Sequence, residues 1–498
     1  MSNCTTFLDV NCRFGKKPAI ILPDHLSLSH HELYSCVCGL AQYLAERGIG
    51  RGDRVCIYLE STPEFLLTYF ALWRIAAVAV PLNRSLTEGE VGHIVEDAGA
   101  AYLIAEEDSR LLASRIRETS RCLQDVVFLP DPENTRGKRR AEHCSPDTIC
   151  QFQYTSGTTG APKGAMLSHA NWMAALDAER ELLRYVPEDV YLGIYPMSHV
   201  GVSWGIAALK AGASWVVMER FELDAYLSLI SERRATVVAS MPPVIHSLIQ
   251  APPGTEEALG SVRALISGGG PLHPTVWRSF WERYRIPIVN AYGLSETLVV
   301  GTGTAIRPED YVTANEFKSV GKPVGYSEVR IVDLDHPEQE LAPGETGEIA
   351  LRGPAVASGY WNLPEATAAV FLPDGWFLTG DIGHLSGNGM LSISDRKKDM
   401  IVMSGWKVYP TEVEKVLIQH QKIRDVAVFG VPDERKGEIP VAAVVVEEGQ
   451  EISFEELEEF SRERLAGYKV PRKMVVVESL PRVHGWKLLR RVLREQFH

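Results

Sequence analysis

The chain has 498 residues and a formal net charge of −13, and 45% of its residues are hydrophobic. This length predicts two or more domains. A chain with this much negative charge is not expected to bind a nucleic-acid backbone. The first ten residues lack a signal-peptide pattern, and the longest apolar stretch, Phe65–Leu82, is interrupted by Arg74 and Pro81. We therefore expect a cytoplasmic protein with no membrane span and no nucleic-acid partner.

All eight cysteines lie within the first 150 residues, and no pair shows Cys-x-x-Cys or zinc-site spacing. Thiols in a reducing compartment are the expected state. No metal site is predicted among them.

Helical and strand patterns alternate through the first part of the chain. This alternation predicts parallel sheets covered by helices. The predicted helices are His30–Arg47 and Pro63–Ile75, and the predicted strands are Arg54–Leu59, Ala76–Pro81, Thr236–Ser240, Ala264–Ser267 and Ile288–Ala291.

After Ser319 the pattern changes to short strands separated by turn residues, which predicts a β-rich segment. A charged cluster, Arg396–Asp399, then precedes a last compact pattern with its own helices and strands. We place a domain boundary at Lys398, between residues 1–397 and 398–498. The strands predicted before it are Glu328–Val332, Gly347–Leu351, Gly375–Thr379 and Met390–Ile393; beyond it lie helices Glu412–His420 and Phe454–Leu465 and strands Val426–Val431 and Val441–Val446.

The strongest motif follows the apolar run Thr148–Tyr154 and reads Thr-Ser-Gly-Thr-Thr-Gly-Ala-Pro-Lys-Gly from Thr155 to Gly164. Glycines allow backbone N–H groups to close on phosphates, hydroxyls add donors, and Lys163 adds positive charge. The order differs from that of the P-loop. A phosphate-binding loop is therefore predicted here.

Five further segments occur in the order found in one superfamily. With this loop, the chain resembles the acyl-adenylate-forming superfamily of acyl-CoA synthetases, peptide-synthetase adenylation domains and luciferases, from about His30 onward. The segments are Ser267–Pro271, Ala291–Thr297, Thr379–Asp381, Asp395–Asp399 with Ser404–Glu414, and Leu480–Arg491.

The resemblance implies a large N-terminal domain of two doubly wound, mostly parallel α/β subdomains with a β-rich, barrel-like subdomain. A small, mobile C-terminal α+β domain would rotate about Lys398. In the relatives the loop at Ser404, Gly405 and Trp406 lines the pantetheine tunnel after this rotation. Many relatives have glycine where this chain has Trp406.

The resemblance also implies the roles of individual residues. Tyr292 would stack on adenine, Asp381 and Arg396 would hold the ribose, and Thr155 and Glu296 would hold Mg²⁺. Lys487 would be the catalytic cation, with Glu296 and His199 as further catalytic residues, although Trp486 stands where relatives have glycine. The implied ATP and AMP contacts are Thr155, Ser156, Gly157, Thr158, Thr159, Lys163, Gly268, Gly269, Gly270, Pro271, Ala291, Tyr292, Gly293, Thr297, Asp381, Arg396 and Lys487.

The segment Tyr195–Leu209 lies where the family lines its acyl site, and it contains no acidic residue. A buried substrate ammonium would have no partner there, which disfavours a free α-amino acid. A fatty acid and an aromatic acid both remain open. The implied pocket comprises His199, Val200, Val202, Trp204, Gly268, Leu298 and Val299.

The sequence thus predicts an AMP-forming acid–CoA ligase that uses ATP, Mg²⁺ and coenzyme A. Transfer to a carrier-protein thiol is the alternative, and a homodimer is left open. A luciferase-like oxygenase is disfavoured because the sequence ends Gln-Phe-His, not Ser-Lys-Leu. The presence of Lys487, Glu296 and Asp381 disfavours a non-catalytic nucleotide-binding regulator.

Overall fold

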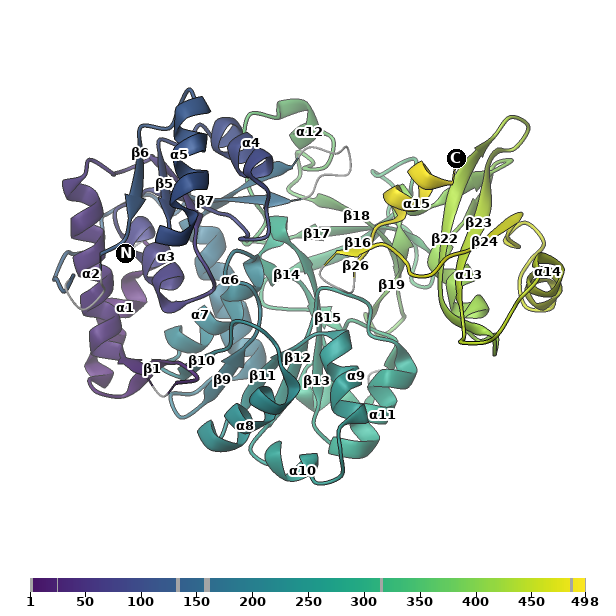
Figure 1. The fold of residues 1–498 in the computed structure, drawn as a ribbon, viewed down its shortest axis with the longest axis horizontal. Helices are drawn as coiled ribbons and strands as arrows, with labels where there is room; N and C mark the ends of the chain where they lie inside the picture. Colours follow the sequence, from purple (N-terminus) through teal and green to yellow (C-terminus); the bar gives the residue numbers. More distant parts are fainter. Residues whose placement is uncertain are drawn as a thin grey trace. The chain divides into compact units, whose positions relative to one another are not determined.

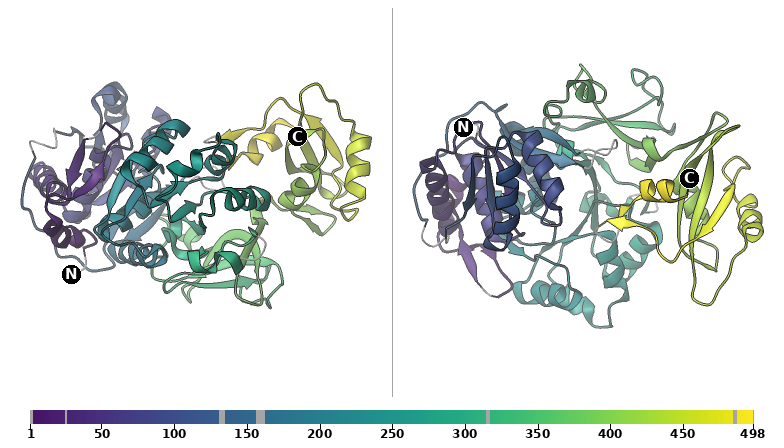
Figure 2. Two further views of the ribbon diagram at one scale, coloured as in Figure 1. Left: turned by 90° about the horizontal axis from the view of Figure 1, so that it is seen from below. Right: turned by 45° about the horizontal axis from the view of Figure 1, so that its top comes forward.

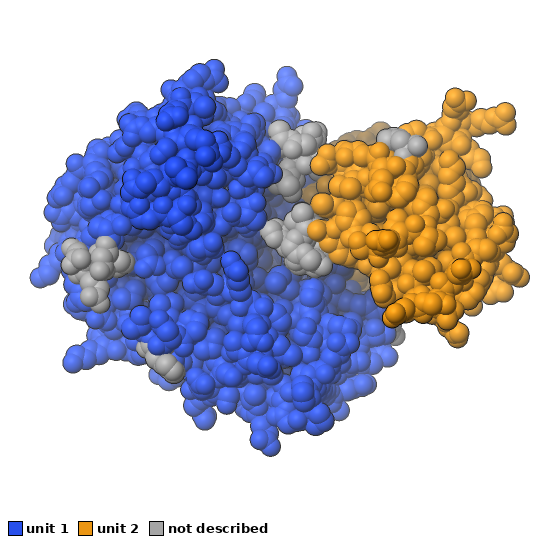
Figure 3. Space-filling view, viewed as in Figure 1, with its two compact units in different colours: residues 1–329, 351–378 blue, residues 330–350, 379–498 orange. Residues whose placement is uncertain are grey.

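The computed structural model describes residues 3–24, 26–130, 135–155, 162–313, 317–483 and 487–497. The chain forms two compact units, coloured separately in Figure 3. The first comprises Met1–Val329 and Leu351–Leu378, and the second Arg330–Ala350 and Thr379–His498. The units divide upstream of Lys398, so the boundary placed there stays a prediction.

The larger sheet of the first unit is built from nine strands: β1 Pro18–Ile21, β2 Ser27–Ser29, β9 Val190–Gly193, β10 Ser214–Val217, β11 Val237–Ser240, β12 Ala264–Ser267, β13 Ile288–Leu294, β14 Val299–Ala305 and β15 Lys322–Pro323. Their order is β15-β14-β13-β12-β11-β9-β10-β1-β2. Neighbours from β13 to β1 are parallel, and the strands at both edges are antiparallel.

A second sheet of the same unit has six strands: β3 Arg54–Tyr58, β4 Val78–Pro81, β5 Tyr102–Ala105, β6 Asp125–Phe128, β7 Ile149–Thr155 and β8 Lys163–Ser168. Its order is β6-β5-β3-β4-β7-β8, and all pairs except β7–β8 are parallel. In both sheets the apolar strands alternate with helices, as the sequence predicts.

The α-helices described for the first unit are α1 Thr6–Asn11, α2 His30–Glu46, α3 Pro63–Arg74, α4 Glu88–Ala98, α5 Arg110–Thr119, α6 His169–Leu183, α7 Ser203–Lys210, α8 Leu223–Arg233, α9 Pro242–Gln250, α10 Thr255–Ala258, α11 Pro274–Tyr284 and α12 Pro364–Ala368. Several begin where the sequence supplies caps, as Ser29 does with Glu32 for α2. Helices α4 and α5 lie side by side over the second sheet (Figures 1 and 2) and bury its apolar face. Trp73 of α3 packs on Trp172 of α6.

The β-rich segment forms a four-stranded sheet, ordered β16-β17-β18-β19, from Glu328–Val332, Gly347–Arg352, Phe377–Leu385 and Leu391–Arg396. The second unit also contains β20 Ile401–Met403, β21 Trp406–Val408, β22 Ile423–Asp433, β23 Gly437–Val446, β24 Lys473–Val476, β25 Arg482–Val483 and β26 Lys487–Leu488, with helices α13 Pro410–Leu417, α14 Phe454–Arg462 and α15 Arg490–Gln496. A long β22–β23 hairpin forms its centre. The mixed α/β fold with a separate C-terminal domain is confirmed.

One predicted strand is displaced. The sequence predicts a strand over Gly375–Thr379, whereas β18 begins at Phe377. The reason is a turn, because the Leu372 N–H donates to the Trp376 carbonyl and Gly375 has a φ of 86°. Backbone of that hand suits glycine and ends strand pairing.

Candidate functional site

The ends of the parallel strands place the predicted acyl and adenine segments together. Strand order in the larger sheet reverses after β10, and in open α/β sheets ligands bind beyond the carboxyl ends of strands at such a point. The segment that follows β9 contains Tyr195, whose hydroxyl donates to the Ser240 carbonyl at the end of β11 (2.6 Å). Ser240 is in register with Ser267, which precedes Gly268–Pro271.

The predicted acyl segment presents mainly apolar side chains. Val200, Val202 and Trp204 are buried. His199 is exposed, and its Nδ1 accepts a hydrogen bond from the Gly201 N–H (3.4 Å). His199 thus directly precedes the 3₁₀ turn Val200–Val202 within the segment, and its catalytic role stays a prediction.

A buried carboxyl group that the sequence analysis missed lies beside this segment. Glu179, in α6, accepts a hydrogen bond from the Ser203 hydroxyl (2.6 Å) and is fully buried. Burial raises the pKa of Glu179 well above its usual range, which favours the protonated form of this carboxyl group. Position 179 lies outside the segment searched for acids, and only the packing of α6 on α7 brings it near.

A strained turn joins the Tyr292 segment to the predicted pocket residues Leu298 and Val299. Both residues have positive φ, 48° and 52°, which is uncommon for residues other than glycine and most costly for the β-branched Val299. Gly293 makes the turn feasible, because a Cβ there would lie 1.6 Å from the Val299 carbonyl oxygen. Such strain is common at ligand-binding positions.

The turn carries Glu296 next to the base of the predicted phosphate loop. Its 3₁₀ turn, Ser295–Thr297, contacts both β7 and β8. The Tyr360 hydroxyl donates to Glu296 Oε1 (2.9 Å), and Lys163 Nζ lies 5.2 Å from the Tyr360 ring centroid. Burial, followed by the Glu296 charge, raises the pKa of Tyr360, so the phenol remains a donor. No motif in the sequence marked Tyr360 as a site residue. An isolated antiparallel β-bridge to Ala165 of β8 positions it beside Glu296.

The ends of the phosphate loop are fixed by strand pairing. Thr155 ends β7, Lys163 begins β8, and the two are register partners. Ser156, Gly157, Thr158 and Thr159 lie outside the described residues. Glu296 and Thr155 offer a carboxylate and a hydroxyl, the oxygen donors that suit Mg²⁺.

The Thr297 hydroxyl makes its contacts within its own turn. Its hydroxyl accepts from the Leu294 N–H (2.9 Å) and contacts the Leu294 and Val299 carbonyls at 3.2 Å. In this structure the hydroxyl therefore stabilises its own turn, and its implied contact with the nucleotide stays a prediction. Ala291 and Tyr292, in the strand before it, are largely buried.

In the second unit, Asp381 and Arg396 are brought together as the sequence predicts. They are register partners on β18 and β19, and Arg396 Nε lies 3.2 Å from Asp381 Oδ1. The Thr379 hydroxyl donates to the Ile349 carbonyl and accepts from the Asp381 N–H, which orients this turn. A carboxylate and a guanidinium held this way are suited to two ribose hydroxyls.

The structure explains why Trp406 is tolerated in the predicted pantetheine loop. Ser404 and Gly405 form a two-residue turn, both with positive φ, between β20 and β21. Trp406 follows the turn as a strand residue paired with Met403, so glycine is not required there. Its ring is exposed and stacks on Tyr468, with centroids 4.8 Å apart.

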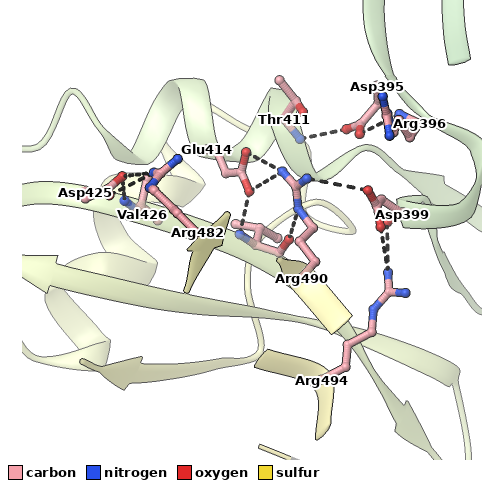
Figure 4. A network of polar contacts seen from close by, with 11 residues as sticks. Asp395, Arg396, Asp399, Thr411, Glu414, Asp425, Val426, Arg482, Arg490 and Arg494 are labelled. Atoms are coloured by element: carbon pink, nitrogen blue, oxygen red, sulfur yellow. Dashed lines mark hydrogen bonds and ion pairs between the residues drawn. The ribbon is translucent and has the colours of Figure 1, made fainter. Parts of the chain in front are cut away.

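The segment around Lys487 is tied to the predicted hinge. Lys487 pairs with Val483 in the β25–β26 hairpin; its side chain and Trp486 lie outside what the structure describes. Helix α15 follows directly, and Figure 4 shows its Arg490 bound to Glu414 (2.7 and 2.8 Å) and facing Asp399. Arg494 also faces Asp399 (3.7 Å). Asp399, directly after Lys398, and Glu414 of α13 are thus linked to the helix after Lys487.

These features are the ones expected of an enzyme that binds a nucleotide and an acid at the carboxyl end of a parallel sheet. Residues 8–361 match the family "AMP-binding enzyme", and residues 412–485 match the "AMP-binding enzyme C-terminal domain". The chain belongs to this family, the acyl-adenylate-forming superfamily, and is an ATP-dependent acid–thiol ligase that forms AMP.

Three relatives illustrate the similarity. A feruloyl-CoA synthase from Amycolatopsis is 34% identical and the match covers 95% of this chain and 94% of the relative. A long-chain-fatty-acid–CoA ligase from Bacillus subtilis is 32% identical, with 98% and 93% covered. The crystal structure of ATP-bound MatB from Rhodopseudomonas palustris superposes with a TM-score of 0.91 at 29% identity, over 100% and 99% of the two chains. Within the described ranges, none of the helices has the length and apolar character needed to cross a membrane.

Proposed function

We propose that this enzyme activates a free carboxylic acid with an apolar body and then transfers the acyl group to coenzyme A. The observation that carries the proposal is the apolar, acid-free segment after β9, with Val200, Val202 and Trp204 buried. The names of the feruloyl and fatty-acyl relatives support coenzyme A as acceptor.

In the first half-reaction a carboxylate oxygen attacks the α-phosphate of ATP, and the bond to pyrophosphate breaks. In the second, the thiol of coenzyme A attacks the acyl carbonyl and AMP leaves. Negative charge increases on the phosphates in the first step, so fixed cations at Lys163 and Lys487 would stabilise its transition state. Thr155 and Glu296 would hold Mg²⁺, which would neutralise phosphate charge when bound.

Products and acceptor are tested together. Purified enzyme with Mg-ATP and a panel of fatty, aromatic and amino acids should form AMP and pyrophosphate with the apolar acids, and acyl-CoA when coenzyme A is added. ADP and phosphate as products would contradict the proposed reaction. Thioester formation on a phosphopantetheine carrier protein, with none on coenzyme A, would favour the alternative acceptor.

Glu179 allows a sharper test of the substrate class. Because burial favours the protonated form of this carboxyl group, which an amide resembles in charge and shape, Glu179→Gln should leave kcat/KM for apolar acids within about threefold of wild type. If the substrate instead carried an ammonium group paired with an ionised Glu179, the amide would abolish turnover of that substrate. Glu181→Gln, on the same helix but exposed, serves as the matched control.

The proposed hinge predicts an asymmetric defect. Proline fixes φ and restricts the preceding residue, so Lys398→Pro should hinder rotation of the C-terminal domain. Thioester formation from supplied acyl-AMP should fall on the order of tenfold or more, while adenylation measured by pyrophosphate release changes less. Lys398→Ala, which removes the charge but keeps φ free, is the control. Equal loss of both half-reactions in the proline variant would show that Lys398 is not the pivot.

A further inference from the structure

Three side chains from distant parts of the chain meet inside the first unit, away from the residues assigned above. Cys4 precedes α1, Cys150 lies in β7, and His169 is the first residue of α6. All three are buried, with exposed fractions of 4%, 0% and 0%. One ligand atom from each lies within 4.8 Å of the others. No spacing rule could predict this cluster, because its members are up to 165 residues apart.

The imidazole of His169 is only partly satisfied in this cluster. Its Nδ1 lies 3.1 Å from Cys4 Sγ and accepts a hydrogen bond from the Cys4 N–H (3.3 Å). Its Nε2 is buried and has no hydrogen-bond partner among the described residues. Because Nδ1 is the ring nitrogen beside the Cys4 sulfur, it is the atom placed to bind a cation, and a bound ion would replace its hydrogen bond from the Cys4 N–H.

The backbone around each donor is held independently of the donor atoms. The Asn3 side chain donates to the Trp73 carbonyl (2.7 Å) and accepts from the Thr5 N–H (3.0 Å), which fixes Cys4 between them. The Trp73 indole N–H donates to the Cys150 carbonyl (3.0 Å). Ser168 and Asn171 form a capping box around the start of α6, where His169 lies. The donors are therefore preorganised.

We propose that Cys4, Cys150 and His169 bind one thiophilic d¹⁰ cation, Zn²⁺ or Cu⁺. Two sulfurs and an imidazole nitrogen are the ligands such ions prefer. From usual bond lengths, donor atoms sharing a tetrahedral zinc are about 3.6–3.8 Å apart, a value between the observed 3.1 Å contact and the 4.8 Å limit. Small side-chain rotations would suffice to admit the ion.

Bound metal would join the segment before α1 to β7 and α6. Strand β7 ends at Thr155, where the phosphate loop begins, so the ion would stiffen the support of that loop. The inference does not depend on the acid or the acceptor that the enzyme uses, and the site shares no residue with the nucleotide or acyl positions.

The metal content of the purified, untagged full chain tests the proposal. Inductively coupled plasma mass spectrometry should find zinc or copper near one equivalent per chain, and its two channels distinguish the ions. Cys4→Ala and Cys150→Ala should each lose the metal. Cys56→Ala removes an equally buried thiol outside the cluster, from β3, and should retain it.

A spectroscopic readout keeps the test independent of variant folding. Wild-type protein stripped with a chelator and refilled with Co²⁺ should show the near-ultraviolet charge-transfer absorption of cobalt–thiolate bonds, and Zn²⁺ should displace it. The proposal is overturned if wild-type protein neither carries nor takes up any of these ions. A Cys4–Cys150 disulfide in protein from reducing cells, or undiminished metal in both cysteine variants, would overturn it equally.

Discussion

Replacing Lys487 with alanine should reduce acyl-adenylate formation about a hundredfold or more, and leave the second half-reaction nearly unchanged. A fixed cation beside a developing phosphate charge is worth on the order of 3 kcal/mol, which corresponds to that factor. The thiol attack follows domain rotation in this family's proposed cycle, after Lys487 has left the site. Pyrophosphate release measures the first step, and conversion of supplied acyl-AMP measures the second.

Two controls give this prediction its specificity. Lys473→Ala removes an exposed lysine from β24 of the same unit and should leave both steps intact. Lys163→Ala tests the other candidate cation, beside Tyr360. If Lys487→Ala leaves adenylation intact while Lys163→Ala does not, the catalytic position was assigned wrongly. If both half-reactions fail in Lys487→Ala, the residue is structural.

The sequence predicts the larger elements well because their patterns are local. Strands β12 and β16 have the predicted bounds, and α2 and α3 each end one residue before the predicted ends. Motif residues that share a strand pair, such as Asp381 and Arg396, are also brought together. Local periodicity and local turn chemistry suffice for such features.

Long-range packing determines the parts of the candidate site that the sequence does not predict. Tyr360 reaches Glu296 only because it forms a β-bridge with Ala165 of β8, and Glu179 meets Ser203 only because α6 and α7 pack together. Nothing in the neighbouring residues marks either position. Trp406 is the converse case. Many relatives have glycine at this position, but the structure places Trp406 in a strand after the turn, where glycine is not required.

Replacing Arg490, which lies in the ion-pair network of Figure 4, is the second change for which we expect a large effect, here on the stability of the second unit. Its guanidinium donates twice to Glu414 and once to the Val428 carbonyl (3.0 Å), and both charged side chains are largely buried. Arg490→Met removes the positive charge but keeps much of the side-chain volume. Glu414 then remains buried without an oppositely charged partner at position 490. Breaking one side of a buried pair in this way costs about 3–5 kcal/mol.

That loss should appear as faster hydrogen–deuterium exchange in peptides from β22, which packs against α13 and α15, and from its hairpin partner β23. Exchange isolates the second unit, which a global melting curve of a two-unit chain would not. Arg491→Met, on the exposed side of α15 where it pairs with Glu495, should change protection by no more than about 0.5 kcal/mol.

A double variant separates the charge effect from packing. Arg490→Met combined with Glu414→Gln removes both charges, and the amide oxygen can still accept from the Val428 N–H as Glu414 does (2.7 Å). A large part of the protection against hydrogen exchange that Arg490→Met loses should then be recovered. The rate of adenylation should be lowest in the single variant and partly restored in the double variant. The reason is that α15 begins three residues after Lys487, and its contact with Asp399 through Arg490 is lost in Arg490→Met. If the single variant exchanges like wild type, the network does not stabilise this unit. If the double variant is no better than the single one, packing of the Arg490 side chain, and not its charge, holds α15 in place.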